Sequence, residues 1–241
     1  MGSGWRIEER TGSAAALHQG WPATVTDPSE RAIGICRVSG PAVVLGSTQQ
    51  MSVVDGGRAQ SAGVAVARRR SGGGAVLVTP ADPIWVDAWI PRSDPLWLDD
   101  VARAFDWVGD TWGRALEGLG IAGVSVHRDG LAACTSWSSL VCFGGVGTGE
   151  VLDADGRKVV GISQRRTRAG AWFHGACLRR WQPGPLLDVL ALDADQRAAA
   201  QSDLAEAATG IDQLLPGLPH SPSVEAKSVV SEFIKALPGG G

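Results

Sequence analysis

The segment "GEVLDADGRKVVGISQRRTRAGAWFHGACLRR", residues 149–180, places the strongest constraint on the fold of this 241-residue chain. Strand-forming residues fill its three parts, and the dipeptides Asp155-Gly156 and Ala169-Gly170 between them are signals for tight reversals. The pattern predicts strand, turn, strand, turn, strand. If the middle strand has no bulge, alternation places four of its residues on one face: Lys158, Val160, Ile162 and Gln164.

Short strand-like runs also fill the first part of the chain. Residues 31–46 predict two short strands around a Ser-Gly-Pro turn, because β-branched residues stand on both sides of the break. Residues 51–63 predict a short helix despite their glycines, and residues 64–70 a third strand. Two further strands are expected at 75–78 and 83–90.

The clearest helical pattern covers residues 98–119. Asp94 before Pro95 is a start signal for this helix, and Gly118 and Gly120 are stop signals. Apolar residues recur at intervals of three and four, as they do on the buried face of an amphipathic helix. These residues are Leu98, Val101, Phe105, Val108, Trp112, Ala115 and Leu119.

The pattern becomes helical from about residue 185. Helices are expected at 186–209 and 221–237, with a Pro-rich linker at 214–222 and a disordered-looking end at 238–241. Strands with interspersed helices, followed by helices, indicate an α+β domain closed by a helical tail. We therefore expect two units, residues 1–190 and residues 191–241.

Charge and composition exclude several classes of protein. A net charge of −3 and a pI near 5.8 argue against general nucleic-acid binding, although a local basic pocket for a small anion stays open. The chain has neither a signal-peptide core nor an apolar run of membrane-spanning length, so we expect a cytoplasmic protein without a membrane partner. Its four cysteines lack metal-ligand spacing, which predicts reduced thiols, no disulfide framework and no metal ligands.

The loop "RRRSGGG", residues 68–74, combines positive charge with a flexible backbone. Three glycines let the backbone approach a ligand and direct N–H groups at it, while the arginines neutralise phosphate or carboxylate. A nucleotide-like anion is therefore the natural ligand. The loop matches neither the dinucleotide-binding nor the P-loop motif, so a flexible basic surface loop is the alternative.

Three further residues are candidates for chemistry. Only three of the 22 basic residues are lysine, which makes Lys158 informative. A partly desolvated ammonium can hold a carbonyl or phosphate oxygen during acyl transfer. The alternative is that Lys158 is an exposed lysine at a strand end. Cys142 lies beside two glycines, and nearby positive charge would favour its nucleophilic thiolate form. His174 either contacts a ligand or is a satisfied core histidine.

Three motifs together resemble a known family. "PAVVLGSTQQ", "VARRRSGGGAVLV" and "GRKVVGISQRR…AWFHGACL" follow the order and approximate spacing of the lipoate-protein ligase A and octanoyltransferase family, which shares its catalytic domain with biotin protein ligases. The resemblance covers roughly residues 5–185. It implies a biotin/lipoate protein ligase-like domain, in which helices flank a mixed sheet and an apolar tunnel holds a lipoyl or octanoyl chain.

The resemblance also implies a set of site residues. The loop would cover an acyl-adenylate, Lys158 would hold the acyl carbonyl and the adenylate phosphate, and His174 would line the ligand. Members usually continue after the glycines with an aromatic residue, His and Asp, whereas Val78 and Thr79 stand here and remove polar groups from the nucleotide site. The other implied ligand-binding residues are Arg68, Arg69, Ser71, Gly72, Gly73, Gly74, Gly161 and Ser163.

Three activities fit this resemblance. The Ser-Gly-Gly-Gly loop favours a ligase that activates lipoate or octanoate with ATP and Mg²⁺ as co-substrates, without a tightly bound cofactor, and transfers it to a lysine of a lipoyl domain or of glycine-cleavage H protein. Cys142 followed by Phe143 resembles instead the cysteine-dependent octanoyltransferases, which take the acyl group from acyl carrier protein. A non-catalytic binder of lipoate is the third alternative.

Overall fold

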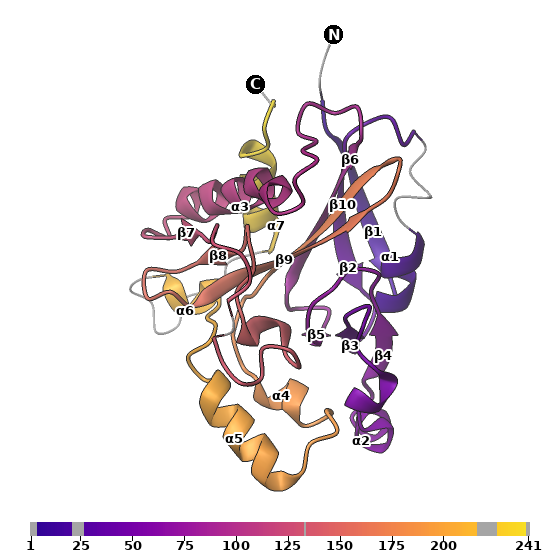
Figure 1. Cartoon of the computed structure of the whole chain (residues 1–241), viewed down its shortest axis with the longest axis vertical. Coiled ribbons are helices and arrows are strands. Elements are labelled where there is room, and N and C mark those ends of the chain that lie inside the picture. The colour runs from indigo at the N-terminus through magenta and orange to yellow at the C-terminus, as the bar shows by residue number, and fades with distance from the viewer. Residues whose placement is uncertain (1–3, 21–26, 133, 216–225, 240–241) are drawn as a thin grey trace.

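A mixed seven-stranded sheet forms the centre of the molecule (Figure 1). The computed structural model describes residues 4–20, 27–132, 134–215 and 226–239. Strand order in the sheet is β1-β2-β6-β10-β9-β8-β7; β1 and β2 are parallel and the other pairs antiparallel. Its strands are β1 (Arg6–Gly12), β2 (Ala32–Val38), β6 (Ile84–Pro91), β7 (Ser125–Val126), β8 (Val151–Leu152), β9 (Lys158–Arg166) and β10 (Gly170–Cys177).

A three-stranded sheet of order β4-β3-β5 and several helices complete the described fold. The small sheet comprises β3 (Ala42–Leu45), β4 (Ala65–Arg68) and β5 (Val76–Val78). The helices are α1 (Ala14–Gly20), α2 (Gly56–Ser61), α3 (Asp106–Gly118), α4 (Gly184–Leu187), α5 (Ala194–Leu204), α6 (Ile211–Leu214) and α7 (Ala226–Lys235), with short 3₁₀ turns at Met51–Val53, Arg103–Phe105 and Cys142–Gly144. The expected α+β fold, a mixed sheet flanked by helices with a helical C-terminal part, is confirmed.

The central strand β6 explains how the two faces of the large sheet are covered. All eight of its residues are buried, as expected for a strand that is covered on both faces. Val86 and Ile90 pack in one cluster with Trp112 of α3 and with side chains of α7, whereas Trp85 packs on the other face with α1 and the small sheet. The space between the large and small sheets is where the candidate site lies.

The long helix begins later than its periodicity predicts. Residues 103–105 form a 3₁₀ turn and α3 begins at Asp106, because the Asp100 carboxylate accepts the backbone N–H groups of Ala102 and Arg103 and so starts the first turn there. Leu98 and Val101 are exposed, so their predicted place on the buried face is wrong. The face formed by Val108, Trp112 and Ala115 is confirmed.

Other predicted elements are broken up or rearranged. Both strands of 31–46 form, but β2 joins the large sheet and β3 the small one. The predicted helix 51–63 divides into a 3₁₀ turn and α2, because Asp55 caps α2 through the N–H of Arg58. The helical region 186–209 divides into α4 and α5, and α7 forms within 221–237. Residues 216–225, which include most of the linker predicted at 214–222, lie outside the described residues.

A β-bulge changes the face of the lysine on β9. Leu152 pairs with Lys158 but Val151 pairs with Val160, so one extra residue is inserted into β9. A methyl group placed on Gly161 would lie 3.3 Å from Cε of Lys158, which puts the lysine side chain on the side of Gly161. The predicted shared face of Lys158, Val160, Ile162 and Gln164 is therefore wrong for Lys158.

The C-terminal helices pack on the rest of the chain. Phe233 of α7 packs against Trp112 of α3 with ring centroids 4.5 Å apart and planes tilted by 49°, and Leu204 of α5 lies in a core cluster with Val43 of β3. The division into residues 1–190 and 191–241 stays a prediction. Among the described helices none is both long and apolar enough to cross a membrane.

Candidate functional site

Arg69 stabilises the glycine loop through hydrogen bonds to its backbone. Its buried guanidinium donates to the carbonyl oxygens of Gly72 (2.8 and 3.1 Å), Gly74 (2.9 Å) and Val44 (3.3 Å). Burial lowers the pKa of Arg69, while Cys142 and Glu150 act in the opposite direction. The N–H groups of Arg69 therefore bond to backbone carbonyl oxygens, and this arginine stabilises the conformation of the glycine loop.

Close backbone contact fixes the position of the loop. Gly73 has a φ of +100°, which favours glycine, and a methyl group on Gly46 would lie 1.8 Å from the carbonyl oxygen of Gly73. The hydroxyl of Ser71 lies 2.8 Å from that of Ser163 on β9. The loop is therefore held between the end of β3 and strand β9.

Lys158 is an almost fully buried ammonium. Its Nζ donates to the carbonyl oxygens of Cys142 (2.8 Å) and Gly145 (3.0 Å), and it lies 2.7 Å from Oε2 of Glu150. Burial by itself would lower the pKa of Lys158, but attraction to Cys142 and Glu150 outweighs it, so the pKa is raised. Lys158 is therefore a charged group although its side chain is buried. The alternative of an exposed lysine at a strand end is wrong.

Glu150 is a site residue that the sequence analysis missed. Its buried carboxylate accepts the N–H groups of Gly147 (2.7 Å) and Ile162 (3.0 Å) in addition to its ion pair with Lys158. These contacts join the loop before β8 to strand β9. Glu150 could have been noticed in the sequence as a single carboxylate among glycines and apolar residues, just before a strand.

Two hollows meet at Cys142. The outer hollow, about 410 Å³, is lined by the glycine loop, Lys158 and Glu150. The inner pocket, about 50 Å³, is lined chiefly by apolar side chains that include Val44, Val78 and Phe143. Three residues line both: Cys142, Ile162 and Ser163. The half-buried thiol of Cys142 thus lies at the junction, where a methyl group on Gly73 would be 3.9 Å from its sulfur.

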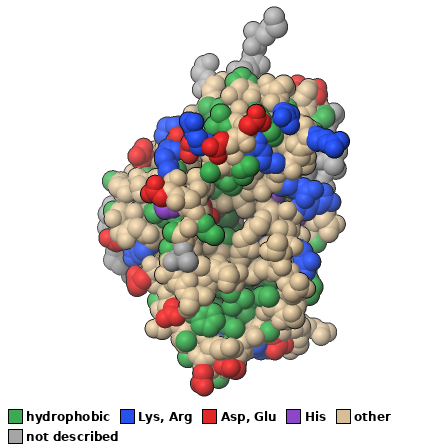
Figure 2. All heavy atoms as spheres, viewed as in Figure 1, with side chains coloured by type: hydrophobic (Ala, Val, Ile, Leu, Met, Phe, Trp, Pro, Cys, Tyr) green, Lys and Arg blue, Asp and Glu red, His purple; other side chains and the backbone are tan. Residues whose placement is uncertain are grey.

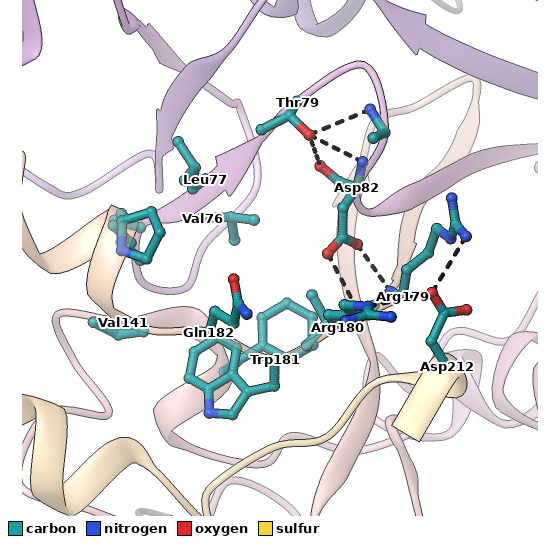
Figure 3. A pocket seen from close by; sticks show the side chains of 16 residues that line it. Val76, Leu77, Thr79, Asp82, Val141, Arg179, Arg180, Trp181, Gln182 and Asp212 are labelled. Atoms are coloured by element: carbon teal, nitrogen blue, oxygen red, sulfur yellow. Dashed lines mark hydrogen bonds and ion pairs between the residues drawn. The ribbon is translucent and has the colours of Figure 1, made fainter. Parts of the chain in front are cut away.

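Figure 3 shows a third hollow, the lateral pocket. It shares the lining residues Val76 and Phe143 with the inner pocket. It measures about 460 Å³, and Trp181 and Arg180 line it. The carboxylate of Asp82 accepts the N–H groups of Arg179 and Arg180, at 2.9 and 3.3 Å, and burial raises the pKa of Asp82. In the view of Figure 2, the molecular surface is hollowed near its middle, and charged side chains lie above this depression.

A polar group of side chains lies beside the inner pocket, and Ser163, His174 and His18 of this group line it. Ser163, His174 and Asp87 stand in one row across β9, β10 and β6. Asp87 Oδ1 lies 2.8 Å from Nδ1 of His174, and Asp87 also accepts from Trp85 and from Arg10 at 3.2 Å. His18 of α1 lies beside His174, with ring centroids 4.9 Å apart. Asp87 and His18 were not predicted from the sequence, although the single charged residue inside "IWVDAWI" marks Asp87 as unusual.

The structure brings most of the expected site residues together. Lys158 and Gly161 share one face of β9, and His174 and Ser163 line the inner pocket with Arg69 and Cys142. Arg68 is exposed at the end of β4 and lines none of the three hollows. Val78 lines the inner pocket, and the Thr79 hydroxyl bonds to the backbone of its own turn.

The four cysteines are free thiols, in agreement with the expectation of no disulfide framework. Cys36 and Cys177 are buried, and burial raises the pKa of both thiols. Cys134 is exposed. Within residues 4–20, 27–132, 134–215 and 226–239, no group of three or more His, Cys, Asp or Glu side chains is arranged to hold a metal ion.

A mixed sheet that carries a hollow lined by a glycine loop and a buried lysine, next to a chiefly apolar pocket, agrees with the class of lipoyl protein ligase catalytic domains. The model of the lipoyl protein ligase A/B catalytic domain matches residues 22–237. The chain belongs to this family.

Solved structures agree with this fold. A bipartite lipoate protein ligase from Thermoplasma acidophilum, described with its E2 lipoyl domain, has a TM-score of 0.73 at 15% identity, covering 96% of this chain and 81% of its own. A lipoate-protein ligase A bound with ATP has a TM-score of 0.67 at 17% identity, with 98% and 84% covered. A T. acidophilum protein with bound lipoic acid has a TM-score of 0.65 at 18% identity, with the same coverage. No curated protein matches the sequence.

Proposed function

We propose that this protein is a lipoate-protein ligase, which activates lipoate or octanoate as an acyl-adenylate and transfers the acyl group to a lysine of a lipoyl domain or of glycine-cleavage H protein. The observation that carries the proposal is the buried, charged Lys158, which lines the outer hollow together with the glycine loop, next to the chiefly apolar inner pocket. Relatives of the same fold were solved with ATP and with lipoic acid, and one is described with an E2 lipoyl domain. These ligands support the choice of substrates and carrier.

The chemistry needs positive charge at one place in two successive steps. A carboxylate oxygen of the acid attacks the α-phosphorus of ATP, and the bond to pyrophosphate breaks. The amine of the carrier lysine then attacks the acyl carbon, the bond between that carbon and the AMP oxygen breaks, and the amine loses a proton. Lys158 would stabilise the negative oxygen in both steps by exchanging a carbonyl partner for a ligand oxygen. Mg²⁺ would arrive with the phosphates of ATP.

The three hollows suggest where each substrate lies. The acyl chain would occupy the inner pocket, with its carboxyl group near Cys142, on the side of the pocket where Gly161 lies against Lys158. The nucleotide would extend past Phe143 into the lateral pocket, where the Trp181 indole offers a stacking surface and the exposed Arg180 a positive charge. The carrier lysine would enter through the outer hollow. Trp181→Ala should then raise the KM for ATP several-fold and leave the KM for lipoate nearly unchanged.

A second function is favoured by the position of Cys142. Its thiol lies at the junction of two hollows, and the guanidinium-bearing side chain of Arg69 lines the inner one with it. In a cysteine-dependent octanoyltransferase, the Cys142 thiolate would attack the octanoyl thioester, and the bond from the acyl carbon to the sulfur of acyl carrier protein would break. The carrier amine would then attack the new thioester and release Cys142. A non-catalytic relative would bind the acid without either transfer.

Mass spectrometry of the carrier protein separates these functions. Purified protein is incubated with a lipoyl domain or H protein and either lipoate with ATP and Mg²⁺, or octanoyl-acyl carrier protein without ATP. The ligase proposal predicts product from the first mixture, undiminished by Cys142→Ala and abolished by Lys158→Ala. Cys134→Ala and Lys227→Ala are the matched controls, because Cys134 is an exposed cysteine and Lys227 lies on α7.

Each of the other outcomes identifies a different function. Product from the thioester alone, lost in Cys142→Ala, would establish the octanoyltransferase instead of the ligase. Binding of lipoate without product in either mixture would establish the non-catalytic relative. Unchanged transfer in Lys158→Ala would overturn the assignment of the site.

A further inference from the structure

The lining of the inner pocket is chiefly apolar but also includes buried polar side chains. His174 and His18 line it together with Val44, Val78 and Phe143, and the two histidines are 6% and 4% exposed. Among the described residues, Nε2 of His174 and Nδ1 of His18 have no hydrogen-bond partner. Buried polar atoms of this kind are rarely left unpaired in proteins, which points to a ligand that meets them.

The hydrogen bond to Asp87 sets what His174 offers to that ligand. A carboxylate accepts hydrogen bonds, so Nδ1 of His174 donates its hydrogen to Oδ1 of Asp87 across 2.8 Å. Asp87 is itself fixed by Arg10 and Trp85, which orients the imidazole ring. In the neutral ring Nε2 then carries a lone pair and accepts a hydrogen bond within the pocket.

His18 is neutral at physiological pH. Burial is the main cause that lowers its pKa to about 2, and the nearby Arg69 and Arg10 act in the same direction. A neutral imidazole carries one donor and one acceptor nitrogen, so His18 can complete a second hydrogen bond to the group that meets His174. A hydroxyl or thiol can donate to one ring and accept from the other, which a methyl group cannot do.

We propose that the inner pocket selects acyl chains with a hydroxyl or thiol group at the end remote from the carboxyl group, and that His174 and His18 recognise this group. The proposal rests on the proposed function in that it takes the ligand of the inner pocket to be an acyl chain. A plain octanoyl chain would leave both buried nitrogens unpaired, whereas a reduced lipoyl chain carries a terminal thiol. His174 and His18 are therefore assigned as residues that determine specificity.

Three acids of equal chain length test the proposal: octanoate, 8-hydroxyoctanoate and 8-mercaptooctanoate. Their dissociation constants for the full chain are measured by calorimetry without ATP, with the thiol kept reduced. We expect the hydroxyl and thiol acids to bind about tenfold more tightly than octanoate, equivalent to about 1.4 kcal/mol. In a wholly apolar pocket the order reverses, because a buried hydroxyl without a partner is costly.

Variants locate the preference. His174→Phe and His18→Phe should each reduce the ratio of octanoate to hydroxyoctanoate dissociation constants to about one or below. Val78→Ala is the control, because Val78 lines the same pocket through apolar contact alone and its loss should weaken all three acids in parallel. Wild-type protein supplies the ratio even if a histidine variant does not fold.

Three results would overturn the inference. Equal or tighter binding of octanoate by the wild type refutes it, and if the carrier is still acylated, the proposed function stands alone. A preference for the polar acids that persists in both folded histidine variants refutes the assignment of the two residues. If none of the acids binds and no carrier is acylated, the inference and the proposed function fall together.

Discussion

Replacing Glu150 by glutamine removes one buried negative charge and keeps the shape of the side chain. In the wild type, Oε2 of Glu150 lies 2.7 Å from Nζ of Lys158, and the two side chains are only 5% and 2% exposed. The ammonium would retain the carbonyl oxygens of Cys142 and Gly145. Because burial disfavours the charged form, we expect the pKa of Lys158 to fall from its raised value.

The expected loss of stability follows from this geometry. Breaking a buried ion pair by removing one partner costs about 3–5 kcal/mol. We expect about 3 kcal/mol, the lower end of that range, because two carbonyl oxygens and the glutamine oxygen still accept from Lys158. A chain of this size loses about 2–4 °C in Tm per kcal/mol, so Glu150→Gln should lower the Tm by about 6–12 °C.

The effect of pH has a defined sign. The pKa of Lys158 is raised in the folded state above its value in the unfolded chain. Its stabilising contribution is therefore fully present below the unfolded pKa of about 10.4 and is lost as the pH rises through the folded pKa. The difference in Tm between wild type and Glu150→Gln should be constant from pH 7 to 9 and shrink at more alkaline pH.

Thermal unfolding followed by circular dichroism measures these differences. Glu232→Gln is the matched control, because Glu232 pairs with Lys235 at 2.6 Å on the surface, where an ion pair contributes at most about 1 kcal/mol. The double variant Glu150→Gln with Lys158→Met should lose less than the sum of the two single losses, since the two side chains interact. A Tm for Glu150→Gln within 2 °C of the wild type, or equal to that of Glu232→Gln, would refute the reasoning.

Three further predictions concern the loop and the histidine pair. Gly46→Ala places a methyl group 1.8 Å from the Gly73 carbonyl oxygen, so it should displace the glycine loop, raise the KM for the acid at least tenfold and destabilise the fold by about 1–3 kcal/mol in chemical denaturation. His18→Gln should make the free energy of unfolding depend less on pH. The pKa of His18 is depressed to about 2 in the folded protein, so the stabilising contribution of the neutral ring is present above about pH 6.5 and is lost as the pH falls. In the wild type this loss amounts to about 2 kcal/mol between pH 6.5 and 4.5. An equal loss in both proteins would contradict this. Ser71→Ala removes the 2.8 Å contact with Ser163 and should cost about 1 kcal/mol in urea unfolding, and an unchanged midpoint would show that this contact does not anchor the loop.

Local signals predicted the elements whose structure depends on neighbouring residues. The strands β9 and β10 were predictable because each is bounded by a turn with a glycine, at Gly156 and Gly170, and β6 because of its run of large apolar residues. The buried stripe of α3 followed from its spacing, but its first turn did not, since capping by Asp100 competes with periodicity. No local feature of the sequence predicted that β3 pairs with β4 and β5 in a separate small sheet.

The candidate site was only half visible in the sequence. The glycine loop, Lys158 and His174 are exceptional in composition or motif, and so could be recognised one at a time. Glu150 and His18 are ordinary residue types, and each becomes informative through a partner distant in the sequence: Lys158 at 2.7 Å and His174 at 4.9 Å between ring centroids. The face of Lys158 also depended on a register shift against β8 that alternation alone does not reveal.

The sequence by itself determined the α+β class, the principal strands and the residue types of the glycine loop, because turn chemistry, periodicity and backbone freedom act over a few neighbouring residues. Only the tertiary structure decided that Arg69 supports the loop, that Glu150 pairs with the buried Lys158, and that two histidines line the apolar pocket. These properties arise from burial and from charges brought together across strands. Both effects depend on distance in space, which the order of residues along the chain does not set.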